Sequence, residues 1–318
     1  MRRREFLTFM AAVVLAPPAF AWPDQPIRMI VPFTPAGGPD LIARYVGERL
    51  PPRLGQPIVV ENVPGASGNI GSQLVARAKP DGHTLMSSVN TLVMNASLYR
   101  NLPYDPVADF APITLSAWGT LVLVAHPARA ARTVDELVAA AKAAPRSLTY
   151  ASPGVGTPHH LAMALLETTT GIELLHVPYK GAAGALQDIL SGQVDYMVLP
   201  VHVAAPHISN GKLKALAVGS LRRVPLLADV PTFAEAGVEG LDVDMWYGFF
   251  APKDTPVDIV SRLNEEITAV LGTEEARIAF EAQGLQRATS SAAGFAEIVA
   301  RDRLRWSDVV AKRDIKAE

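Results

Sequence analysis

A Gly/Pro turn between an apolar stretch and a helical pattern is the first segment whose residue types could bind a ligand. Residues 27–33 are apolar and rich in β-branched side chains, which indicates a buried parallel strand. Residues 34–39 read Thr-Pro-Ala-Gly-Gly-Pro, and apolar residues recur with helical spacing after Asp40. The first turn of a helix has N–H groups without an intrahelical acceptor, and the helix dipole adds about half a positive charge there. The turn therefore suits a carboxylate or a phosphate, although an ordinary strand–helix connection has the same pattern.

The same arrangement recurs in the second half of the chain. Residues 148–151 predict a strand, residues 152–158 form a second Gly/Pro turn, and apolar residues at helical spacing follow. Thr157 is a good N-cap residue, and Pro158 then occupies the first helical position, where proline is favoured. Two such turns predict two similar α/β domains that face each other.

A third glycine-rich loop lies between them in the sequence. Gly65, Gly68 and Gly71 have the spacing GxxGxxG rather than the GxGxxG of a dinucleotide-binding fold, and no acidic residue is placed to bind a ribose. The loop therefore predicts the lining of a cleft rather than a nucleotide site, with plain loop chemistry as the alternative.

Residues for catalysis or metal binding do not form a recognisable pattern. The seven histidines include no HxH or HExxH spacing, and the absence of cysteine leaves no thiolate ligand. Ser152 stands in Ala-Ser-Pro-Gly, which is not the GxSxG turn of a hydrolase. Asp40 suits the positive end of its own helix better than a catalytic role. We therefore predict no catalytic residue, no metal site and no cofactor.

The order of the predicted elements indicates how these turns are positioned. Strand and helix patterns alternate on either side of a turn-rich connector at residues 101–112, which predicts two doubly wound sheets. The last third holds a short helix over 229–236, a strand over 246–251 and three helices, too little for a third domain. We therefore expect the chain to return to the first domain, with crossings near residues 118–125 and 244–250. The expected domains are 22–120 with 247–318, and 121–246.

Composition narrows the class of protein. The chain has 318 residues, of which 49% are hydrophobic and 19% charged, so it is globular and large enough for two domains. A formal net charge of −2 gives no sign of nucleic-acid binding. The absence of cysteine excludes disulfides, iron–sulfur clusters and a lipid-modified N-terminal cysteine.

The N-terminus has the pattern of an export signal. Three arginines at positions 2–4 precede an apolar stretch over residues 6–16, and Ala19-Phe20-Ala21 has the small-x-small pattern of a cleavage site. We therefore expect residues 1–21 to be a signal peptide that is removed near Ala21. The paired Arg3 and Arg4 also fit a twin-arginine signal, so both export routes stay open. No later segment is apolar enough to predict a membrane helix.

Taken in order, short runs of the chain resemble the Bug family of periplasmic solute receptors, which serve tripartite tricarboxylate transporters. The resemblance covers essentially the whole mature chain and rests on many runs in one order. These runs include Pro26–Phe33 with Gly37–Asp40, Val60–Asn62 with Pro64–Gly71, Pro80–Gly82, Leu102–Pro106, Asp109–Pro112, Gly156–Thr157 with His160–Ala162, His176–Gly181, Gly192–Asp195, and Asp229–Thr232 with Ala234–Gly237.

The resemblance implies a type II periplasmic-binding-protein fold, with two doubly wound α/β domains joined by two crossover strands. It also implies a periplasmic protein, likewise without a bound cofactor, that closes on a small carboxylate and delivers it to the membrane subunits of a transporter. The two turns would grip carboxylates from opposite domains. The implied ligand-binding residues are Phe33, Thr34, Pro35, Ala36, Gly37, Gly38, Asn69, Ser87, Ser88, Asn90, Ser152, Gly156, Thr157, His160, Leu199 and His202.

Two departures from the family pattern bear on the ligand. Ala36 stands where the family usually has glycine, and Leu199 lies where a polar residue is often found, a contact that His202 could replace. This argues against an amino-acid ligand such as aspartate. For His160, a donor in the cleft and a ring packed in the helix are equal alternatives. A sensor for a membrane kinase and a secreted carboxylate hydrolase or lyase are the alternative functions, and a monomer suits a receptor that must close.

Overall fold

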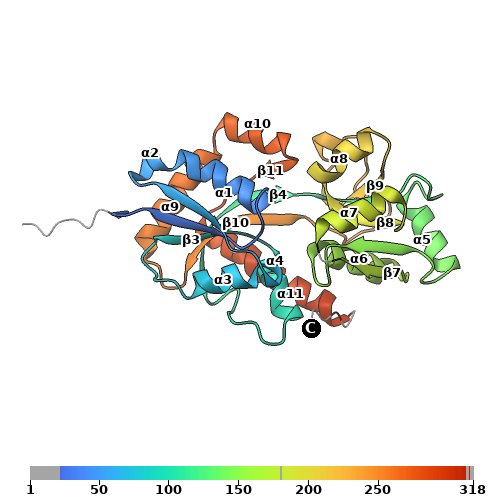
Figure 1. The fold of residues 1–318 in the computed structure, drawn as a ribbon, viewed down its shortest axis with the longest axis horizontal. Helices are drawn as coiled ribbons and strands as arrows, with labels where there is room; N and C mark the ends of the chain where they lie inside the picture. The colour runs from blue at the N-terminus through green and yellow to red at the C-terminus, as the bar shows by residue number, and fades with distance from the viewer. Residues whose placement is uncertain (1–21, 180, 313–314, 316–318) are drawn as a thin grey trace, which may run out of the picture.

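The structure is a computed structural model that describes residues 22–179, 181–312 and 315. The predicted signal peptide lies outside the described residues. The chain forms two α/β lobes side by side, each built on its own sheet (Figure 1). Within the described residues, no helix combines the length and the apolar character needed to cross a membrane.

The first lobe is built on a six-stranded sheet with the order β11-β4-β10-β3-β1-β2. Strand β1 is parallel to β2 and β3, whereas β10 is antiparallel to both β3 and β4. The carboxyl ends of β1, β2 and β3 therefore meet at one edge of the sheet. The strands are β1 (Ile27–Val31), β2 (Ile58–Asn62), β3 (Thr84–Val89), β4 (Phe110–Gly119), β10 (Met245–Pro252) and β11 (Leu285–Arg287).

Helices cover this sheet because their apolar faces need a partner. Helix α1 packs on β2 and β3, and the long C-terminal helix α11 packs against α4 and β4. The helices are α1 (Gly38–Arg49), α2 (Pro51–Leu54), α3 (Asn69–Ala76), α4 (Thr91–Leu98), α9 (Val257–Leu271), α10 (Glu274–Ala282) and α11 (Ala292–Lys312), with a 3-10 turn η1 (Ala66–Gly68) before α3.

The second lobe is built on a five-stranded sheet with the order β7-β6-β8-β5-β9. Successive residues of the fully buried strand β5 alternate between two cores, with Leu123 on one face and Val122 on the other. The strands are β5 (Leu121–Ala125), β6 (Thr149–Ser152), β7 (Leu175–Pro178), β8 (Tyr196–Pro200) and β9 (Lys214–Val218); the helices are α5 (Val134–Ala143), α6 (Pro158–Thr170), α7 (Ala182–Ser191) and α8 (Val201–Ser209), with a 3-10 turn η2 (Pro225–Leu227).

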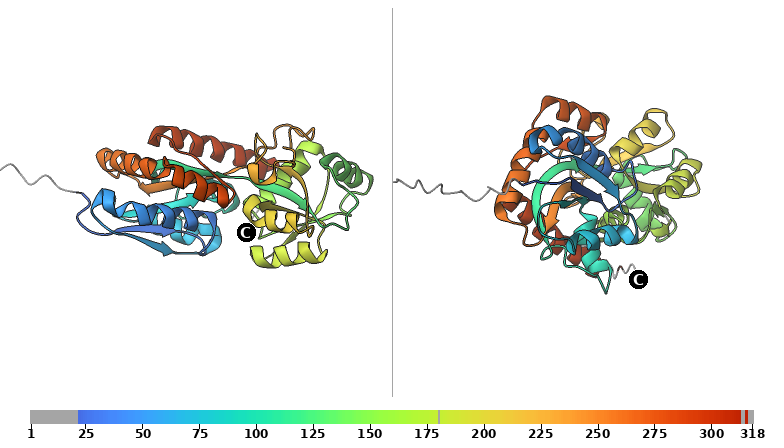
Figure 2. Two further views of the ribbon diagram at one scale, coloured as in Figure 1. Left: turned by 90° about the horizontal axis from the view of Figure 1, so that it is seen from above. Right: turned by 60° about the vertical axis from the view of Figure 1, so that its left-hand side comes forward.

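The chain passes between the lobes twice. Strand β4 of the first sheet ends at Gly119 and β5 of the second begins at Leu121, so only Thr120 separates them. The return runs from the end of β9 through residues 219–244 into β10 (Figure 2). This arrangement confirms the predicted fold class of two α/β domains joined by crossover strands, whereas the predicted domain boundaries stay a prediction.

Two local predictions were wrong. No helix forms over residues 229–236: Thr232 and Glu235 exchange side-chain and backbone hydrogen bonds as in a capping box, but the chain turns away at Gly237, where φ is +80°. The connector predicted at residues 101–112 ends in the long strand β4. Pro112 is accommodated there at an irregularity in the pairing with β10.

Candidate functional site

The first turn connects β1 to α1 at the carboxyl edge of the sheet. Gly37 is the N-cap residue of α1, and its carbonyl oxygen accepts hydrogen bonds from the N–H groups of Asp40 and Leu41. The N–H groups of Gly37 and Gly38 donate to no group among the described residues. These two donors, at the positive end of α1, can bind an anion.

Asp40 is held by its neighbours and is not available to a ligand. Its carboxylate accepts hydrogen bonds from the Ala36 N–H (2.9 Å), from Arg44 Nε (3.0 and 3.1 Å) and from Asn62 Nδ2 (2.9 Å). Burial alone would raise the pKa of Asp40, but these bonds and the charge of Arg44 outweigh it and hold the pKa below its usual value. The structure thus agrees with a structural role for Asp40: the ionised carboxylate fixes the turn and Arg44 balances its charge.

Ala36 adopts an unusual backbone conformation in this turn. Its φ is +66°, in the left-handed region that normally favours glycine. In this conformation the Ala36 N–H donates a hydrogen bond to the Asp40 carboxylate. Compared with glycine, the alanine at this position therefore destabilises the folded backbone and makes the turn stiffer.

The second turn connects β6 to α6 and is fastened by side chains. The Thr157 hydroxyl accepts from the His160 N–H (3.4 Å) and donates to the Gly154 carbonyl (2.8 Å), so Thr157 is the N-cap residue, as predicted. The Gly156 N–H donates to His160 Nδ1 (3.0 Å). The N–H groups of Val155 and His159 have no acceptor among the described residues, which leaves them as the donors of this turn.

Two histidine rings and one tyrosine ring stack beside the second turn. The rings of His160 and His176 stack with centroids 4.0 Å apart, and Tyr150 stacks on His176 at 4.8 Å. His176 Nε2 lies 2.7 Å from the hydroxyl of Ser152, which is fully buried. Burial lowers the pKa of His176 to about 4, so its ring is neutral at pH 7. In this geometry the His160 ring is packed and its Nδ1 orders the turn, while its donor role in the cleft stays a prediction.

The glycine-rich loop before α3 has a strained backbone. Four successive residues from Gly65 to Gly68 have positive φ, and two of them, Ala66 and Ser67, are not glycine. The side chain of Asn95 holds the loop by donating to the Ser67 carbonyl (3.0 Å) and to Asn69 Oδ1 (2.6 Å).

Asn69 is oriented by a second donor. The Tyr104 hydroxyl donates to Asn69 Oδ1 at 2.8 Å, so this oxygen accepts two hydrogen bonds from the protein. Asn69 Nδ2 makes no hydrogen bond to the described residues, and the carboxamide can offer only donors to a ligand. The predicted role of Asn69 in ligand binding stays a prediction.

The predicted residues at the end of β3 are buried under the first turn. The Ser87 hydroxyl donates to the Pro39 carbonyl (2.9 Å), and the Asn90 Nδ2 group donates to the Asp244 carbonyl (3.4 Å). The Ser88 hydroxyl and Asn90 Oδ1 are buried with no hydrogen-bond partner among the described residues. Ser87 therefore stabilises the start of α1. Asn90 links the end of β3 to the segment that precedes β10.

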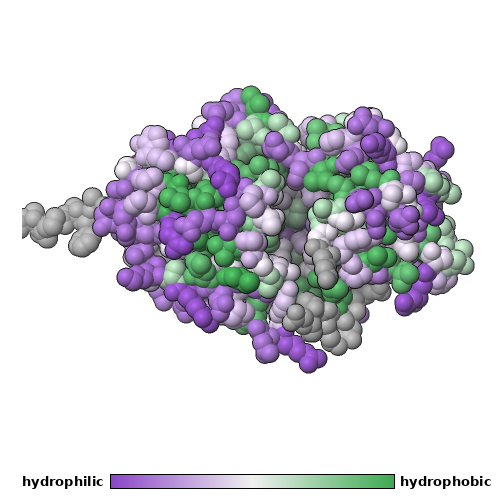
Figure 3. All heavy atoms as spheres, in the orientation of Figure 1, coloured by the Kyte–Doolittle hydropathy of each residue, from purple (hydrophilic) through white to green (hydrophobic). Residues whose placement is uncertain are grey.

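The two turns lie on opposite lobes, and the second turn reaches the first lobe. A Cβ at Gly156 would come within 2.6 Å of Leu98 at the end of α4, so the second turn contacts the first lobe directly. A furrow runs between the lobes on the face in Figure 3. The same helix α4 holds the Asn69 loop through Asn95, and a shared ligand site of the two turns and this loop stays a prediction.

Leu199 and His202 lie elsewhere. Leu199 is 1% exposed and packs in the core of the second lobe, and its contact with a ligand stays a prediction. His202, near the start of α8, packs against Gly284 of the first lobe. The predicted role of His202 as a replacement for the polar contact at Leu199 stays a prediction.

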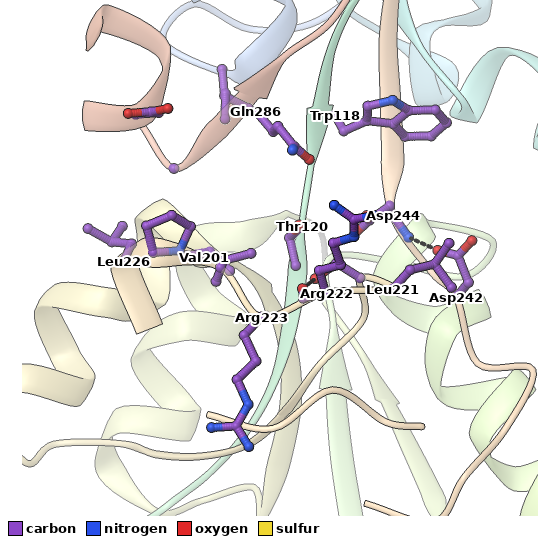
Figure 4. Close-up of a pocket in the computed structure, with 16 residues that line it drawn as sticks. Trp118, Thr120, Val201, Leu221, Arg222, Arg223, Leu226, Asp242, Asp244 and Gln286 are labelled. Carbon is purple, nitrogen blue, oxygen red and sulfur yellow. Dashed lines mark hydrogen bonds between the residues drawn. The ribbon is translucent and has the colours of Figure 1, made fainter. Parts of the chain in front are cut away.

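Sequence reasoning missed a cavity of about 540 Å³ next to the crossing strands. It lies between α8 and η2 of one lobe and α10 and β11 of the other, with Trp118 and Thr120 at its wall (Figure 4). Arg223 points away from it and pairs with Glu235 (2.9 Å). No residue of either turn lines this cavity, so it is separate from the candidate site. Among the described residues, no group of three His, Asp or Glu side chains could hold a metal ion.

Comparison with known proteins shows the family of this chain. Residues 42–315 match the family described as "Tripartite tricarboxylate transporter family receptor". BugT of Bordetella pertussis is 35% identical over 312 residues, which cover 97% of this chain and 96% of BugT. These matches confirm the predicted family.

Solved structures add the fold and, for two relatives, a bound acid. R. palustris Rpa4515 with adipate has a TM-score of 0.83 and 33% identity over 93% of this chain and 99% of its own. MatC of Rhodopseudomonas palustris with bound malate has a TM-score of 0.79 and 32% identity over 91% of this chain and 100% of its own. The chain therefore belongs to the tripartite tricarboxylate transporter receptor family, the Bug-type periplasmic solute-binding proteins.

Proposed function

We propose that this protein is a periplasmic receptor that closes on a small dicarboxylate and delivers it to a membrane transporter of the tripartite tricarboxylate type. One observation carries the proposal: each lobe offers the positive end of a helix with N–H donors that have no acceptor in the described chain. These are Gly37 and Gly38 on the first lobe, and Val155 and His159 on the second.

Two donor turns on opposite lobes suit a ligand with an acid group at each end. Adipate and malate, which relatives bind, are such ligands. Neither turn presents a free cationic side chain among the described residues, since Arg44 is paired with Asp40. Recognition by N–H groups and the Asn69 carboxamide is expected to depend little on ionic strength compared with recognition by exposed arginines.

The ligand can stabilise the closed state only if it binds that state better than the open one. A dicarboxylate that contacts both turns does so, because the second carboxylate gains its donors only when the lobes approach. A monocarboxylate contacts one turn and is expected to produce binding without compaction.

The hydrogen bond between Ser152 and His176 is the one observation that favours an enzyme. A serine beside a histidine can be a nucleophile and its base, with a third group to orient the base. Here Ser152 is fully buried, its hydroxyl is also bonded to Gly154, and no carboxylate among the described residues bonds to His176. We therefore propose that this pair fastens the turn and that the protein is not an enzyme.

The test is a thermal-shift screen of succinate, malate, adipate, citrate, benzoate and aspartate, followed by calorimetry and mass spectrometry of the recovered ligand. We expect stoichiometric binding of at least one dicarboxylate, recovered unchanged, and compaction by small-angle scattering. Turnover of the ligand would contradict the receptor function.

The variant Gly37→Glu tests whether the first turn binds the ligand carboxylate. Gly37 has φ −80°, and a Cβ there has no neighbour closer than 3.8 Å, so the fold tolerates the side chain. Its carboxylate would occupy the helix end, and we expect the ligand-induced thermal shift to disappear. Ser261→Glu, which adds the same charge on an exposed position of α9, is the matched control. If Gly37→Glu bound the ligand as tightly as the wild type, the first turn would not be the carboxylate-binding site.

A further inference from the structure

Tyr247 lies where the first turn meets the crossing strands. It is on β10, between Val89 of β3 and Ala117 of β4 in the ladder. Its ring fills the space beside two glycines: a Cβ at Gly38 would come within 2.6 Å of the ring, and a Cβ at Gly119 also within 2.6 Å. The absence of a side chain at both positions is what allows the ring to reach the start of α1.

The Tyr247 hydroxyl lies at the positive end of α1. Its oxygen is 2.7 Å from the position that a Cβ would take at Gly38 and 3.0 Å from the equivalent position at Gly119. It makes no hydrogen bond to any group in the described part of the chain, although the residue is only 3% exposed. A phenol hydroxyl without a protein acceptor can donate its hydrogen to a bound ligand.

The surroundings keep this hydroxyl protonated. Burial raises the pKa of Tyr247 far above its usual value, and the nearby Asp244 carboxylate raises it further. The group is therefore a neutral O–H donor at every pH in which the protein works. Next to it, the N–H groups of Gly37 and Gly38 also lack acceptors.

We propose that Tyr247 is a further ligand-binding residue, whose hydroxyl donates to the carboxylate held at the start of α1. The inference rests on the proposed receptor function and adds a third donor to the first turn. Because Tyr247 belongs to the strand that carries the chain between the lobes, its hydrogen bond also joins the bound acid to a crossing strand. Neither turn alone provides that connection.

The test compares Tyr247→Phe with Tyr45→Phe. The first variant removes one oxygen and leaves the ring between Gly38 and Gly119. The control removes a hydroxyl on helix α1 that is buried with no hydrogen-bond partner among the described residues, where the Tyr45 ring packs on Phe280 at 5.3 Å. Calorimetry with succinate, malate, adipate and citrate gives the affinity of each protein, and thermal unfolding without ligand gives its stability.

We expect Tyr247→Phe to weaken the best-bound of these acids about 10-fold or more, because a hydrogen bond to a charged group is lost. Its melting temperature without ligand should be nearly unchanged, since the hydroxyl bonds to no described residue and the ring stays in place. Tyr45→Phe should keep the wild-type affinity. This combination separates a ligand contact from a packing role, which would lower stability and leave affinity alone.

A second measurement does not depend on a variant. The chain has 7 tyrosines, so ¹³Cζ-labelled tyrosine gives a resolvable NMR spectrum, in which the Tyr247 signal should move on addition of the acid. Equal affinities of Tyr247→Phe and wild type, or an unmoved signal, would overturn the role of Tyr247 and leave the receptor function intact. If the wild-type protein bound none of the four acids, both the role of Tyr247 and the proposed receptor function would be overturned.

Discussion

Ser152 Oγ and His176 Nε2 are 2.7 Å apart, and the same hydroxyl lies 2.9 Å from the Gly154 carbonyl. A serine hydroxyl has one hydrogen, and either neighbour can receive it. The hydrogen is therefore used within the protein, and Ser152 can offer a ligand only an acceptor. A carboxylate would avoid it, so Ser152 contributes to the second turn by holding its shape.

Replacement of His176 by glutamine should loosen the second turn and change the pH dependence of stability. The folded pKa of about 4 lies below the unfolded value of about 6.5, so the unfolded state binds more protons between these values. The wild type therefore loses stability from this group as pH falls from about 6.5 to about 4. His176→Gln should be less stable at pH 7.5, with a flatter profile in acid.

Chemical unfolding at pH 7.5, 6 and 4.5 measures this effect. His126→Gln, a change at the end of β5 in the same lobe, is the control for loss of a histidine. If the two variants gave parallel profiles, the His176 ring would not be the group that titrates.

Replacement of Asp244 by asparagine should have the opposite sign of pH dependence. Burial raises the pKa of Asp244 to about 7, with Asp242 adding to the effect, and Asp244 Oδ1 is buried without a partner. The folded state therefore binds more protons than the unfolded state between about pH 4 and 7, and wild-type stability falls as pH rises through that window. Asp244→Asn should be more stable than wild type at pH 8, on the order of 2 kcal/mol, and equal to it below pH 4.

Calorimetric melting at pH 4, 6 and 8 follows this difference. The neighbouring Asp242→Asn serves as a comparison, because the Asp242 carboxylate accepts a hydrogen bond from the Asp244 N–H. A constant gap between Asp244→Asn and wild type across this range would mean that Asp244 is ionised throughout.

Replacement of Ala36 by glycine should stabilise the protein. An L-residue in the left-handed region costs about 1–2 kcal/mol, and glycine relieves this cost at the expense of a more flexible unfolded chain. We expect a net gain of about 0.5–1 kcal/mol in urea unfolding. Ala36→Val, with a β-branched side chain at the same φ of +66°, should lose stability. Equal stabilities of the glycine and valine variants would indicate a different backbone at this turn.

Replacement of Tyr104 by phenylalanine should free the Asn69 carboxamide. The lost hydrogen bond is buried, and its removal should cost about 1 kcal/mol. Asn69 Oδ1 keeps only the donor from Asn95, so the amide can rotate, and acid binding should weaken several-fold. Tyr99→Phe removes a comparable hydroxyl that bonds to Ser67 instead, and it should affect binding less. Unchanged acid binding by Tyr104→Phe would show that Asn69 does not contact the ligand.

Local signals in the sequence were enough for most elements of the fold. The strand predicted over residues 27–33, the helix predicted from Asp40 and the Thr157–Pro158 cap are set by neighbouring residues, so their pattern is visible without the rest of the chain. In the structure the strand is shorter, over Ile27–Val31, and the helix begins earlier, at Gly38. Helix α4 and strand β11 were not predicted. Strand β11 is only three residues long and exists because it pairs with β4, more than 150 residues away.

The sequence by itself determined the two donor turns, the alternation of strand and helix, and the family, because each depends on residues close together in the chain. Only the tertiary structure decided which polar groups already have partners. It showed that Asp40, Ser152 and the Gly156 N–H are used internally, that Leu199 is in the core, and that Tyr247 reaches the first turn. Hydrogen-bond partners and burial depend on contacts between distant segments, and no local pattern encodes them.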